Sequence, residues 1–414
     1  MSARHPHTSK LSQAAQGQPN APLPVLQERQ LRRLNIGLLI PTLQSGGAER
    51  VCSVLANHWA RKGHHVTLMT YADASGDSFP VSPFVTRVVL GNAQLTSGRW
   101  STLTKNMARV FALRRQIKDL KLDVALSFMS VSNSNLALAG RGLTAVCIGA
   151  ERTYPPAVPL PRLAEWARWA LYGWLDAVAA QTSEAAAWLQ ANTRAKSVAV
   201  IPNPVELPLA CSLPRLDPIT LRSAGSLMLL AVGRLSTEKN FERLIRAFAR
   251  ALDTPGAAAN QLNWQLIIVG EGPERAALTR LIEQLGANGK VLLPGRAGNM
   301  ADWYKAADAF ALTSDFEGYP NGLLEALAYG VPSVACDCLT GPRELIDDGV
   351  NGLLVATNSR SELTSALRRL TGDSSLRKQL GSHADITLNA HAIESISARW
   401  ESVFAQAMAA KGCA

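Results

Sequence analysis

Two carboxylates in the C-terminal half of the chain have a spacing that suits ligand binding. Glu317 and Glu325 lie eight positions apart in the stretch SDFEGYPNGLLEALAYGVP, which covers residues 314–332. Glu325 is the one charged residue between Gly318 and Cys336, where the chain is otherwise mostly apolar or small. An ionised group that faced a core without partners would be strongly destabilising, so we expect Glu325 to face a cleft.

The elements around these acids predict where a ligand would lie. AFALTS has the pattern of a strand, DFEGYP that of a loop, and NGLLEALAYG that of a helix, with Pro320 suited to the first turn. Glu325 then lies one turn beyond Asn321 on the same face, about 6 Å from the helix start at about 1.5 Å per residue. Phosphates bind at helix N-termini, so a ligand with its phosphates there would offer hydroxyl groups to Glu325.

Two other loops have residues that favour an anion. Gly46 and Gly47 in QSGGAER stand between a strand and a helix, where backbone N–H groups attract phosphate, although Gly-Gly also suits an ordinary tight turn. In VGRLSTEKNFERL, Arg234 leaves a strand and Lys239 comes just before a helix start. A cation at that end of a helix is unfavourable unless an anion lies beside it, so the pattern predicts either a bound anion or a solvated lysine.

The order of apolar and amphipathic segments predicts the fold. The 414 residues suffice for two domains. Short apolar runs such as LNIGLLIP (34–41) alternate with helical patterns as far as IPNPVELPLACSLPRLDP (201–218), which holds five prolines, and the alternation starts again at SLMLLAVG (226–233). This order indicates an α/β protein with two doubly wound, mostly parallel sheets, a proline-rich hinge, and a cleft between the domains.

Taken together, the motifs resemble those of one enzyme family. The similar segments are the E-x7-E pair Glu317…Glu325, GRLSTEKN, the Gly-Gly loop, LIIVGEGPERAAL, VLLPGRAGNMADWYKAADAFALTS and GPRELIDDGVNGLLV. In order and spacing they resemble the retaining, nucleotide-sugar-dependent glycosyltransferases of family 4, which have the GT-B fold of two facing Rossmann-like domains. The likeness covers nearly the whole chain from Leu34. SFMSVSN, ERTYPP and DCLTGPRELI resemble the branch that extends lipid-linked bacterial surface oligosaccharides.

The resemblance implies a division of the chain into five segments. We expect residues 1–33 to be a disordered tail and residues 34–205 to form an N-terminal Rossmann-like acceptor domain. Residues 206–222 would be a proline-rich linker, and residues 223–390 a C-terminal Rossmann-like domain for the nucleotide-sugar donor. Residues 391–414 would form a helix that packs back on the N-terminal domain.

The resemblance also implies roles for named residues. Arg234 and Lys239 would hold the donor diphosphate, and Glu317 would lie beside the donor sugar, so these three are the expected catalytic residues. Glu325 would accept hydrogen bonds from the ribose. The backbone around the start of the helix would lie near sugar and phosphate, namely at Gly318, Tyr319, Pro320 and Asn321. Gly46 and Gly47 would touch the phosphate or the acceptor, and Arg296 the base.

The expected reaction needs neither a metal nor a cofactor, because the nucleotide-sugar is a substrate and the chain has no D-x-D motif. A UDP-linked hexose or N-acetylhexosamine is the expected donor. A breaking glycosyl–phosphate bond places charge on the diphosphate, which fixed cations and amide dipoles stabilise. Some relatives carry a histidine near the loop after LSFMSVSN, whereas this chain has none between His65 and His383.

Three other functions compete with this interpretation. The first alternative is an oxidoreductase, because VGEGPERAAL is similar to a dinucleotide-binding fingerprint. The motif lacks the third glycine, however, and does not lie in the first βα unit. A non-catalytic relative that binds a nucleotide-sugar as a scaffold would be expected to lose Arg234, Lys239 or Glu325, and all three are present. Nucleic acid is not expected as a partner, because nothing resembles a recognition motif.

Charge and composition favour an anionic membrane surface as a partner. The net charge is +10, and residues 31–120 hold twelve Lys/Arg against four Asp/Glu, a net +8. The basic helix pattern TLTKNMARVFALRRQIKDLK and the aromatic RLAEWARWALYGWLD suit an anionic bilayer, although ordinary amphipathic and core helices have similar patterns. We therefore expect a glycolipid or other membrane-bound saccharide acceptor, with a soluble acceptor as the alternative.

The same composition predicts the cellular compartment. The six cysteines show no disulfide-like spacing, which favours a reducing cytosol. Residues 1–33 lack the apolar segment of a signal peptide, and no apolar run in the chain approaches the about 20 residues that span a bilayer. The expected location is therefore the cytoplasm, peripheral at the inner face of the cell membrane.

Overall fold

The computed structural model describes residues 32–44, 46–91, 99–252 and 263–412. The chain separates into the segment Met1–Arg33 and the compact unit Leu34–Ala414, and the second of these is described below. Most of the predicted tail, residues 1–31, lies outside the described residues. Among the described helices, none is both long and apolar enough to cross a bilayer.

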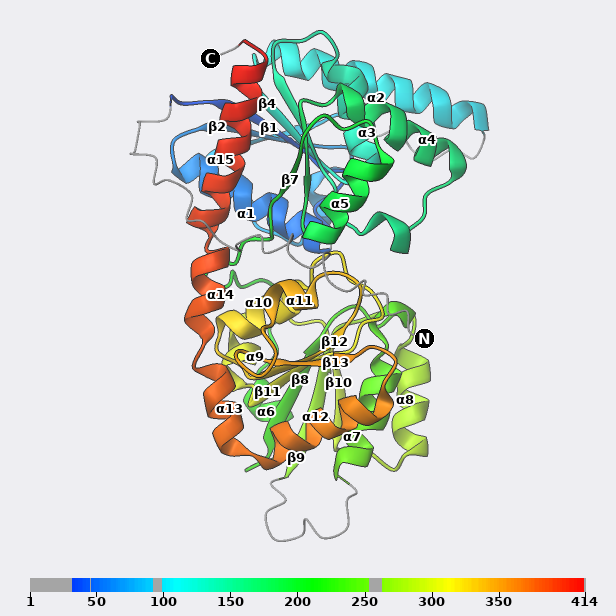
Figure 1. Ribbon diagram of the computed structural model, residues 1–414, viewed down its shortest axis with the longest axis vertical. Helices are drawn as coiled ribbons and strands as arrows, with labels where there is room; N and C mark the ends of the chain where they lie inside the picture. Colours follow the sequence, from blue (N-terminus) through cyan, green and yellow to red (C-terminus); the bar gives the residue numbers. More distant parts are fainter. Residues whose placement is uncertain (1–31, 45, 92–98, 253–262, 413–414) are drawn as a thin grey trace, which may run out of the picture. The chain divides into compact units, whose positions relative to one another are not determined.

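The first half of the compact unit is built on a parallel sheet. Within the described residues the sheet has seven strands in the order β3-β2-β1-β4-β5-β6-β7, and all pairs are parallel. The strands are β1 Asn35–Leu39, β2 His65–Thr70, β3 Val85–Val89, β4 Val124–Phe128, β5 Val146–Ala150, β6 Ala177–Ala180 and β7 Val198–Val200. The longer helices between them, which cover the faces of the sheet (Figure 1), are α1 Gly47–Arg61, α2 Arg99–Asp119, α3 Ser130–Gly140, α4 Arg162–Leu171 and α5 Ser183–Asn192.

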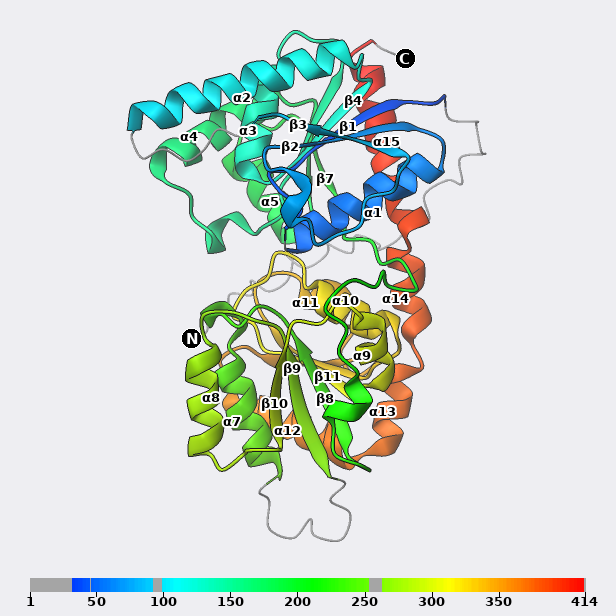
Figure 2. The ribbon, with the colours of Figure 1, turned by 180° about the vertical axis from the view of Figure 1, so that it is seen from behind.

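A second parallel sheet follows the proline-rich segment. In the described residues it has six strands in the order β10-β9-β8-β11-β12-β13. They are β8 Leu227–Val232, β9 Trp264–Val269, β10 Val291–Gly295, β11 Ala309–Leu312, β12 Ser333–Asp337 and β13 Leu353–Ala356. Its helices, seen around the sheet in Figures 1 and 2, are α6 Pro218–Leu221, α7 Phe241–Leu252, α8 Arg275–Gln284, α9 Met300–Ala306, α10 Asn321–Ala328, α11 Pro342–Leu345, α12 Arg360–Gly372, α13 Ser374–Gly381 and α14 Ala384–His391.

The strand orders explain where the loops of interest meet. In each sheet the order reverses at one point, between β1 and β4 in the first and between β8 and β11 in the second. Ligands of open α/β sheets bind beyond the carboxyl ends of the strands at such switch points. The loop after β8 carries Arg234 and Lys239, and the loop after the neighbouring β11 carries Glu317. The predicted fold class, α/β with two Rossmann-like doubly wound sheets, is confirmed.

Two stretches of chain connect the halves and lie against each other. Val205, in the proline-rich segment, donates its N–H to the carbonyl of His391 at 2.8 Å and forms an isolated parallel bridge with Ala392. The last helix, α15 Ile393–Ala410, then packs on α1 of the first half. Trp59 Nε1 donates to Ser397 Oγ at 3.0 Å, so α15 is fixed to α1 by a buried polar contact within an apolar cluster.

Candidate active site

Glu317 and Lys239, which are far apart in the sequence, form a direct ion pair. Glu317 lies in the loop between β11 and α10 with 7% of its surface exposed. Its Oε1 accepts a hydrogen bond from Lys239 Nζ at 2.6 Å and another from Ser314 Oγ at 2.6 Å. The hydroxyl of Thr340 donates to the backbone carbonyl of Glu317. The carboxylate is therefore held in one orientation beside the start of α10.

The neighbouring loops are fixed to each other by their backbones. The N–H of Asp315 donates to the carbonyl of Glu238 at 2.8 Å, which joins the β11–α10 loop to the loop after β8. Asn240, directly after Lys239, adopts the left-handed conformation with φ of 49°. Its side chain donates to the Asp315 carboxylate at 3.1 Å. These bonds place Lys239 and Glu317 as parts of one connected structure.

Glu325 has the polar partner that its apolar surroundings require. It lies on α10 with 5% of its surface exposed, and its Oε1 is 2.5 Å from Arg50 Nη1 on α1 of the first half. Burial opposes the charge on Arg50, but Glu325, with smaller contributions from Tyr304 and Tyr329, more than offsets burial and raises the pKa of Arg50. Burial and the negative charge of Glu325 also raise the pKa of Tyr304. Sequence reasoning missed Arg50, although it stands three residues after Gly47 in QSGGAER.

The start of α10 is in contact with the first half as well. Asn203 Nδ2 donates to Asn321 Oδ1 at 2.6 Å, and Asn203 Oδ1 accepts from Gln181 Nε2 at 2.8 Å and from Arg152. A Cβ atom at Gly47 would lie 2.6 Å from Asn321 Nδ2, so a larger residue at position 47 would displace the Asn321 amide. Asn203, Gln181 and Arg152 are buried, and sequence reasoning did not identify them.

The residues just before α10 are also packed closely. A Cβ atom at Gly318 would lie 2.7 Å from the carbonyl oxygen of Arg152, so glycine is required there. Tyr319 is buried, and its hydroxyl lies 2.6 Å from Nε2 of His391, next to the point where the chain crosses between the halves. Pro320 precedes the first helical residue, Asn321. These contacts set the position of the N-terminus of α10.

Two other predicted residues, Arg234 and Arg296, form no described bond with the Lys239–Glu317 pair. Arg234 is exposed after β8, and in the part of the chain that the structure describes no hydrogen bond or ion pair reaches its guanidinium. Arg296 is exposed after β10. It lies near Glu271, whose pKa is lowered by hydrogen bonding from Arg275 and also by the charge of Arg296. Both arginines are on loops at the carboxyl edge of the second sheet, near the Lys239–Glu317 pair in topology but without bonds to it.

The first Gly of the Gly-Gly loop has a conformation that favours glycine. Gly46 precedes α1 with φ of 136°, and a Cβ atom there would meet the carboxylate of Glu49. Burial raises the pKa of Glu49. An anion at this helix start would therefore compete with the Glu49 side chain for the same space.

Glu151, the first residue of the motif ERTYPP, has a structural role. Glu151 is 1% exposed, and it accepts hydrogen bonds from Tyr172 at 2.7 Å and Ser130 at 2.8 Å. Burial raises the pKa of Glu151. Its carboxylate joins the end of β5 to α3 and to the segment after α4. Among the described residues, no group of three His, Cys, Asp or Glu is arranged to hold a metal ion.

Comparison with protein families identifies both halves. Residues 45–208 match the model described as Glycosyltransferase Family 4, and residues 215–386 match that described as Glycosyl transferases group 1. Together the two matches cover most of the chain, and the boundary between them falls in the proline-rich segment.

Two named relatives align with the chain over most of its length. The chain is 28% identical over 379 residues to the GalNAc-alpha-(1->4)-GalNAc-alpha-(1->3)-diNAcBac-PP-undecaprenol alpha-1,4-N-acetyl-D-galactosaminyltransferase of Campylobacter jejuni, which covers 90% of this chain and 99% of that protein. It is 27% identical to the amylovoran biosynthesis glycosyltransferase AmsD of Erwinia amylovora, over 87% of this chain and 96% of that protein. An exopolysaccharide phosphotransferase of Streptomyces coelicolor is 34% identical, but the match spans 23% of that longer protein.

The fold is shared with solved structures. The complex of Anabaena Alr3699/HepE with UDP-glucose superposes with a TM-score of 0.71 over 91% of this chain and 100% of that one, at 19% identity. The relatives of the chain include glycosyltransferases of bacterial surface-polysaccharide synthesis. The chain itself belongs to the family 4 glycosyltransferases and has their GT-B fold.

Proposed function

We propose that the chain transfers a hexose or N-acetylhexosamine from a UDP-sugar to a membrane-associated saccharide acceptor, with retention of the anomeric configuration. The observation that carries the proposal is the 2.6 Å contact between Lys239 and Glu317 at the start of α10. A cation, a fixed carboxylate and a helix N-terminus at one place are what a bound sugar diphosphate requires.

Each proposed role follows from chemistry at this place. Lys239 and the exposed Arg234 would bind the diphosphate and stabilise the charge that it gains as the glycosyl bond breaks. Glu317 would accept hydrogen bonds from the donor sugar. One of its oxygens already accepts bonds from Lys239 and Ser314, which holds the carboxylate in place as an acceptor for the sugar hydroxyls. Attack by the acceptor from the side of the leaving group would then give retention without a carboxylate nucleophile.

Glu325 would hold the ribose of the nucleotide. It is buried one turn into α10, where its Oε1 is paired with Arg50 and Tyr304 lies close by, so a ribose hydroxyl would bind beside these groups. The UDP-glucose in the related Anabaena structure supports a uridine donor. Arg296, exposed after β10, would face the base. Gly46 and Gly47 would approach the phosphate or acceptor, and no metal would be needed.

A panel of nucleotides tests the donor assignment. Isothermal titration with UDP, GDP and NAD, each with and without EDTA, should give binding of UDP alone and the same affinity with chelator. A preference for NAD, or loss of UDP binding in EDTA, would contradict the proposal. Binding without any transfer to acceptors would instead favour a non-catalytic scaffold.

The acceptor side of the proposal rests on an exposed apolar and basic surface. Phe111 and Trp166 are 63% and 60% exposed, on α2 and α4 respectively. Both helices pack on α3, and Figure 1 shows the three on one side of the first sheet. The surface, called the α2–α4 surface below, comprises Met107, Phe111, Arg115, Lys118, Lys121, Leu163 and Trp166, all exposed.

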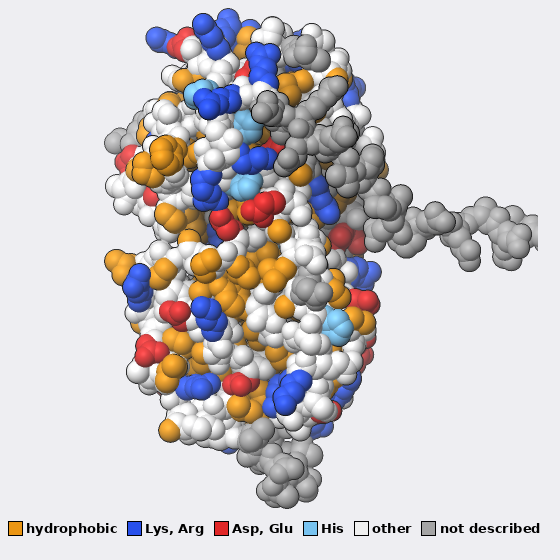
Figure 3. Space-filling view, turned by 90° about the vertical axis from the view of Figure 1, so that its left-hand side faces the viewer, with side chains coloured by type: hydrophobic (Ala, Val, Ile, Leu, Met, Phe, Trp, Pro, Cys, Tyr) orange, Lys and Arg blue, Asp and Glu red, His pale blue; other side chains and the backbone are white. Residues whose placement is uncertain are grey.

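Arg115 of this surface is paired with Asp119 at 3.2 Å, and two other basic residues of α2 also have intramolecular partners. Arg114 donates to the carbonyls of Ala139 and Arg141, and Arg109 lies over the ring of Tyr71 at 4.8 Å. The side chain of Lys105 lies outside those that the structure describes. On the face opposite to α2 and α4, shown in Figure 3, basic and acidic side chains are interspersed. The α2–α4 surface is therefore the proposed contact with an anionic bilayer, at the cytoplasmic side.

Co-sedimentation with liposomes tests this contact. The protein should sediment with anionic vesicles at low salt and should not sediment with neutral vesicles. High salt should release it from the anionic vesicles. Failure to bind in every condition would contradict the membrane claim and favour a soluble acceptor. The expected acceptor is a saccharide on a polyprenyl diphosphate, and the name of the Campylobacter relative supports that class.

A further inference from the structure

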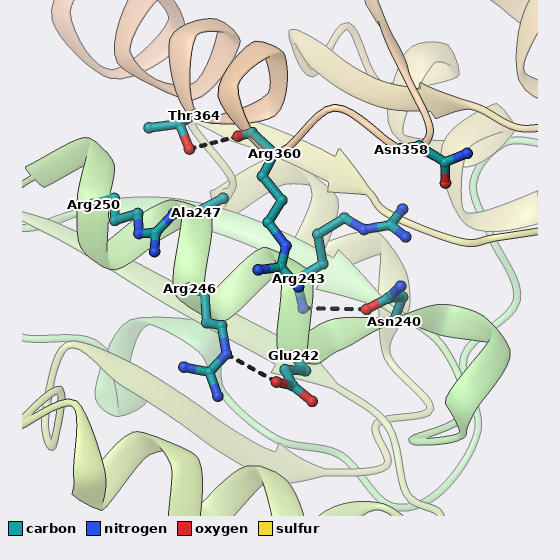
Figure 4. A pocket seen from close by; sticks show the side chains of 9 residues that line it. All are labelled: Asn240, Glu242, Arg243, Arg246, Ala247, Arg250, Asn358, Arg360 and Thr364. Carbon is teal, nitrogen blue, oxygen red and sulfur yellow. Dashed lines mark hydrogen bonds and ion pairs between the residues drawn. The ribbon is translucent and has the colours of Figure 1, made fainter.

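A basic cavity lies on the second half, on the side of α7 that faces α12. Its volume is about 320 Å³, and its polar lining includes four arginines and a single acid. Arg243, Arg246 and Arg250 come from α7, and Arg360 is the first residue of α12. Figure 4 shows Arg360 reaching from α12 toward α7, with the α7 arginines around it.

Of the four arginines that line this cavity, two have an acidic partner among the described residues. Arg246 Nε bonds to Glu242 at 2.8 Å, and Arg243 Nη2 bonds to Asp315 at 2.6 Å. No hydrogen bond or ion pair reaches the guanidinium of Arg250 or of Arg360 from any residue in the described ranges. Like charges repel when they share a hollow with little counter-charge, so a bound anion would stabilise the arrangement.

The geometry suits a small anion with several phosphate groups. Arginine presents a planar fork that binds phosphate oxygens in pairs, and here the forks come from two different helices. Asn240, Asn358 and Thr364 add neutral polar groups to the lining. Because the arginines surround a hollow, the shape favours a small soluble molecule over a flat bilayer surface.

We propose that this cavity, called the α7–α12 cavity below, binds a soluble anion carrying two or more phosphate groups at a place separate from the donor site. The two places are nonetheless connected. Arg243 is bonded to Asp315, which stands two residues before Glu317, and Asn240 directly follows Lys239. An anion that drew Arg243 away from Asp315 would loosen the loop that carries Glu317. By linkage, the anion and the donor would then each change the affinity of the other.

Titration of inorganic tripolyphosphate tests the α7–α12 cavity. Four proteins are compared by isothermal titration calorimetry: the natural chain, Arg250→Ala/Arg360→Ala, Arg369→Ala, and Arg234→Ala/Lys239→Ala. Arg369 is a matched control because it is exposed on the same helix α12 but does not line the cavity. The replaced arginines are exposed, whereas Lys239 is partly buried against Glu317, so circular dichroism is used to check that every variant is folded.

The cavity predicts a specific pattern. Loss of Arg250 and Arg360 should weaken one binding event by about a hundredfold, at about tenfold for each charged hydrogen-bonding side chain. Arg369→Ala should bind like the natural chain, and Arg234→Ala/Lys239→Ala should retain that binding event. Absence of tripolyphosphate binding to the natural chain would overturn the proposal. The proposal would also be overturned if tripolyphosphate binding were retained in Arg250→Ala/Arg360→Ala and lost in Arg234→Ala/Lys239→Ala.

A second arm separates a soluble anion from a lipid headgroup, since both offer phosphate. Vesicles of phosphatidylglycerol are sedimented with the natural chain and with Arg250→Ala/Arg360→Ala. Equal sedimentation of the two proteins, together with the loss of tripolyphosphate binding, supports the proposal. Sedimentation that falls in the variant while tripolyphosphate binds neither protein would assign the cavity to the membrane and overturn it.

Discussion

Arg50 Nη1 lies 2.5 Å from Glu325 Oε1, so the carboxylate proposed to hold the ribose is paired with a side chain from the other half of the molecule. Both groups are largely buried, with side-chain exposures of 27% and 7%. The pair therefore joins α1 to α10 and gives Glu325 a charged partner in a mostly apolar helix. A donor bound at Glu325 would lie beside this contact.

Removal of Arg50 should destabilise the protein, because it leaves Glu325 buried without its cation. We expect Arg50→Ala to lower the free energy of unfolding by about 1–3 kcal/mol, measured by urea denaturation. The double variant with Glu325→Ala should lose less than the sum of the two single losses, since the residues are in contact. Strict additivity would mean that the two side chains do not interact in solution.

Glu325→Ala should weaken UDP binding. A hydrogen bond from a ribose hydroxyl to a charged acceptor is worth about 1.5–3 kcal/mol, so the dissociation constant should rise by about tenfold to a hundredfold. Titration calorimetry measures the change. Glu283→Ala is the matched control, because Glu283 is an exposed acid on α8. An unchanged UDP affinity in folded Glu325→Ala would remove Glu325 from the site.

Lys239→Ala should slow turnover more than it weakens donor binding. The charge of Lys239 would stabilise the transition state, in which the diphosphate gains charge, more than it stabilises the bound donor. We therefore expect kcat to fall by about a hundredfold while the donor dissociation constant changes less. Arg234→Ala should act in the same direction. Steady-state kinetics and donor titration are compared with Lys305→Ala, an exposed lysine on α9. A variant that loses binding and keeps kcat would assign Lys239 to ground-state binding alone.

The folded protein should become less stable as pH falls toward 5. Burial lowers the pKa of His391, so its imidazole beside Tyr319 stays neutral in the folded chain. Below the unfolded value of about 6.5, the unfolded chain binds a proton that the folded chain does not, and the free energy of unfolding decreases. His391→Gln should flatten this decrease between pH 7 and pH 5.5 in urea denaturation series.

Other groups contribute to the same curve, so the comparison is with the natural chain. Burial also lowers the pKa values of His58 and His64, which remain in the variant and keep part of the slope. The raised pKa of Glu151 acts in the opposite sense in both proteins. An identical pH dependence for His391→Gln and the natural chain would show that His391 does not titrate in this window.

Sequence patterns could place some of the candidate residues near one another. Lys239 and Glu317 both follow strands that end at the same edge of a parallel sheet, so their nearness could be expected, but their direct ion pair was not predicted. The need of Glu325 for a polar partner also followed from its apolar neighbours. Its identity as Arg50 did not, because the partner comes from a helix on the other sheet and no local pattern specifies that contact.

Other features could not be read from the sequence for the same reason. Asn203 stands in a proline-rich segment that looks like a simple linker, yet its amide reaches Asn321 at the start of α10. Arg243 appears as an ordinary amphipathic-helix residue, and only the packing of α7 beside the β11–α10 loop pairs it with Asp315. Periodicity reveals which face of an element is buried, but it does not reveal which distant polar group lies opposite.

Transfer of sugar to a polyprenyl-diphosphate saccharide tests the central claim most directly. The natural chain and Lys239→Ala are incubated with UDP-hexoses and UDP-N-acetylhexosamines in EDTA, and the anomeric configuration of the product is determined by NMR. The account predicts one extended saccharide that keeps the configuration of the donor, formed without metal and strongly reduced in Lys239→Ala. A product of inverted configuration, or equal rates in the two proteins, would contradict it.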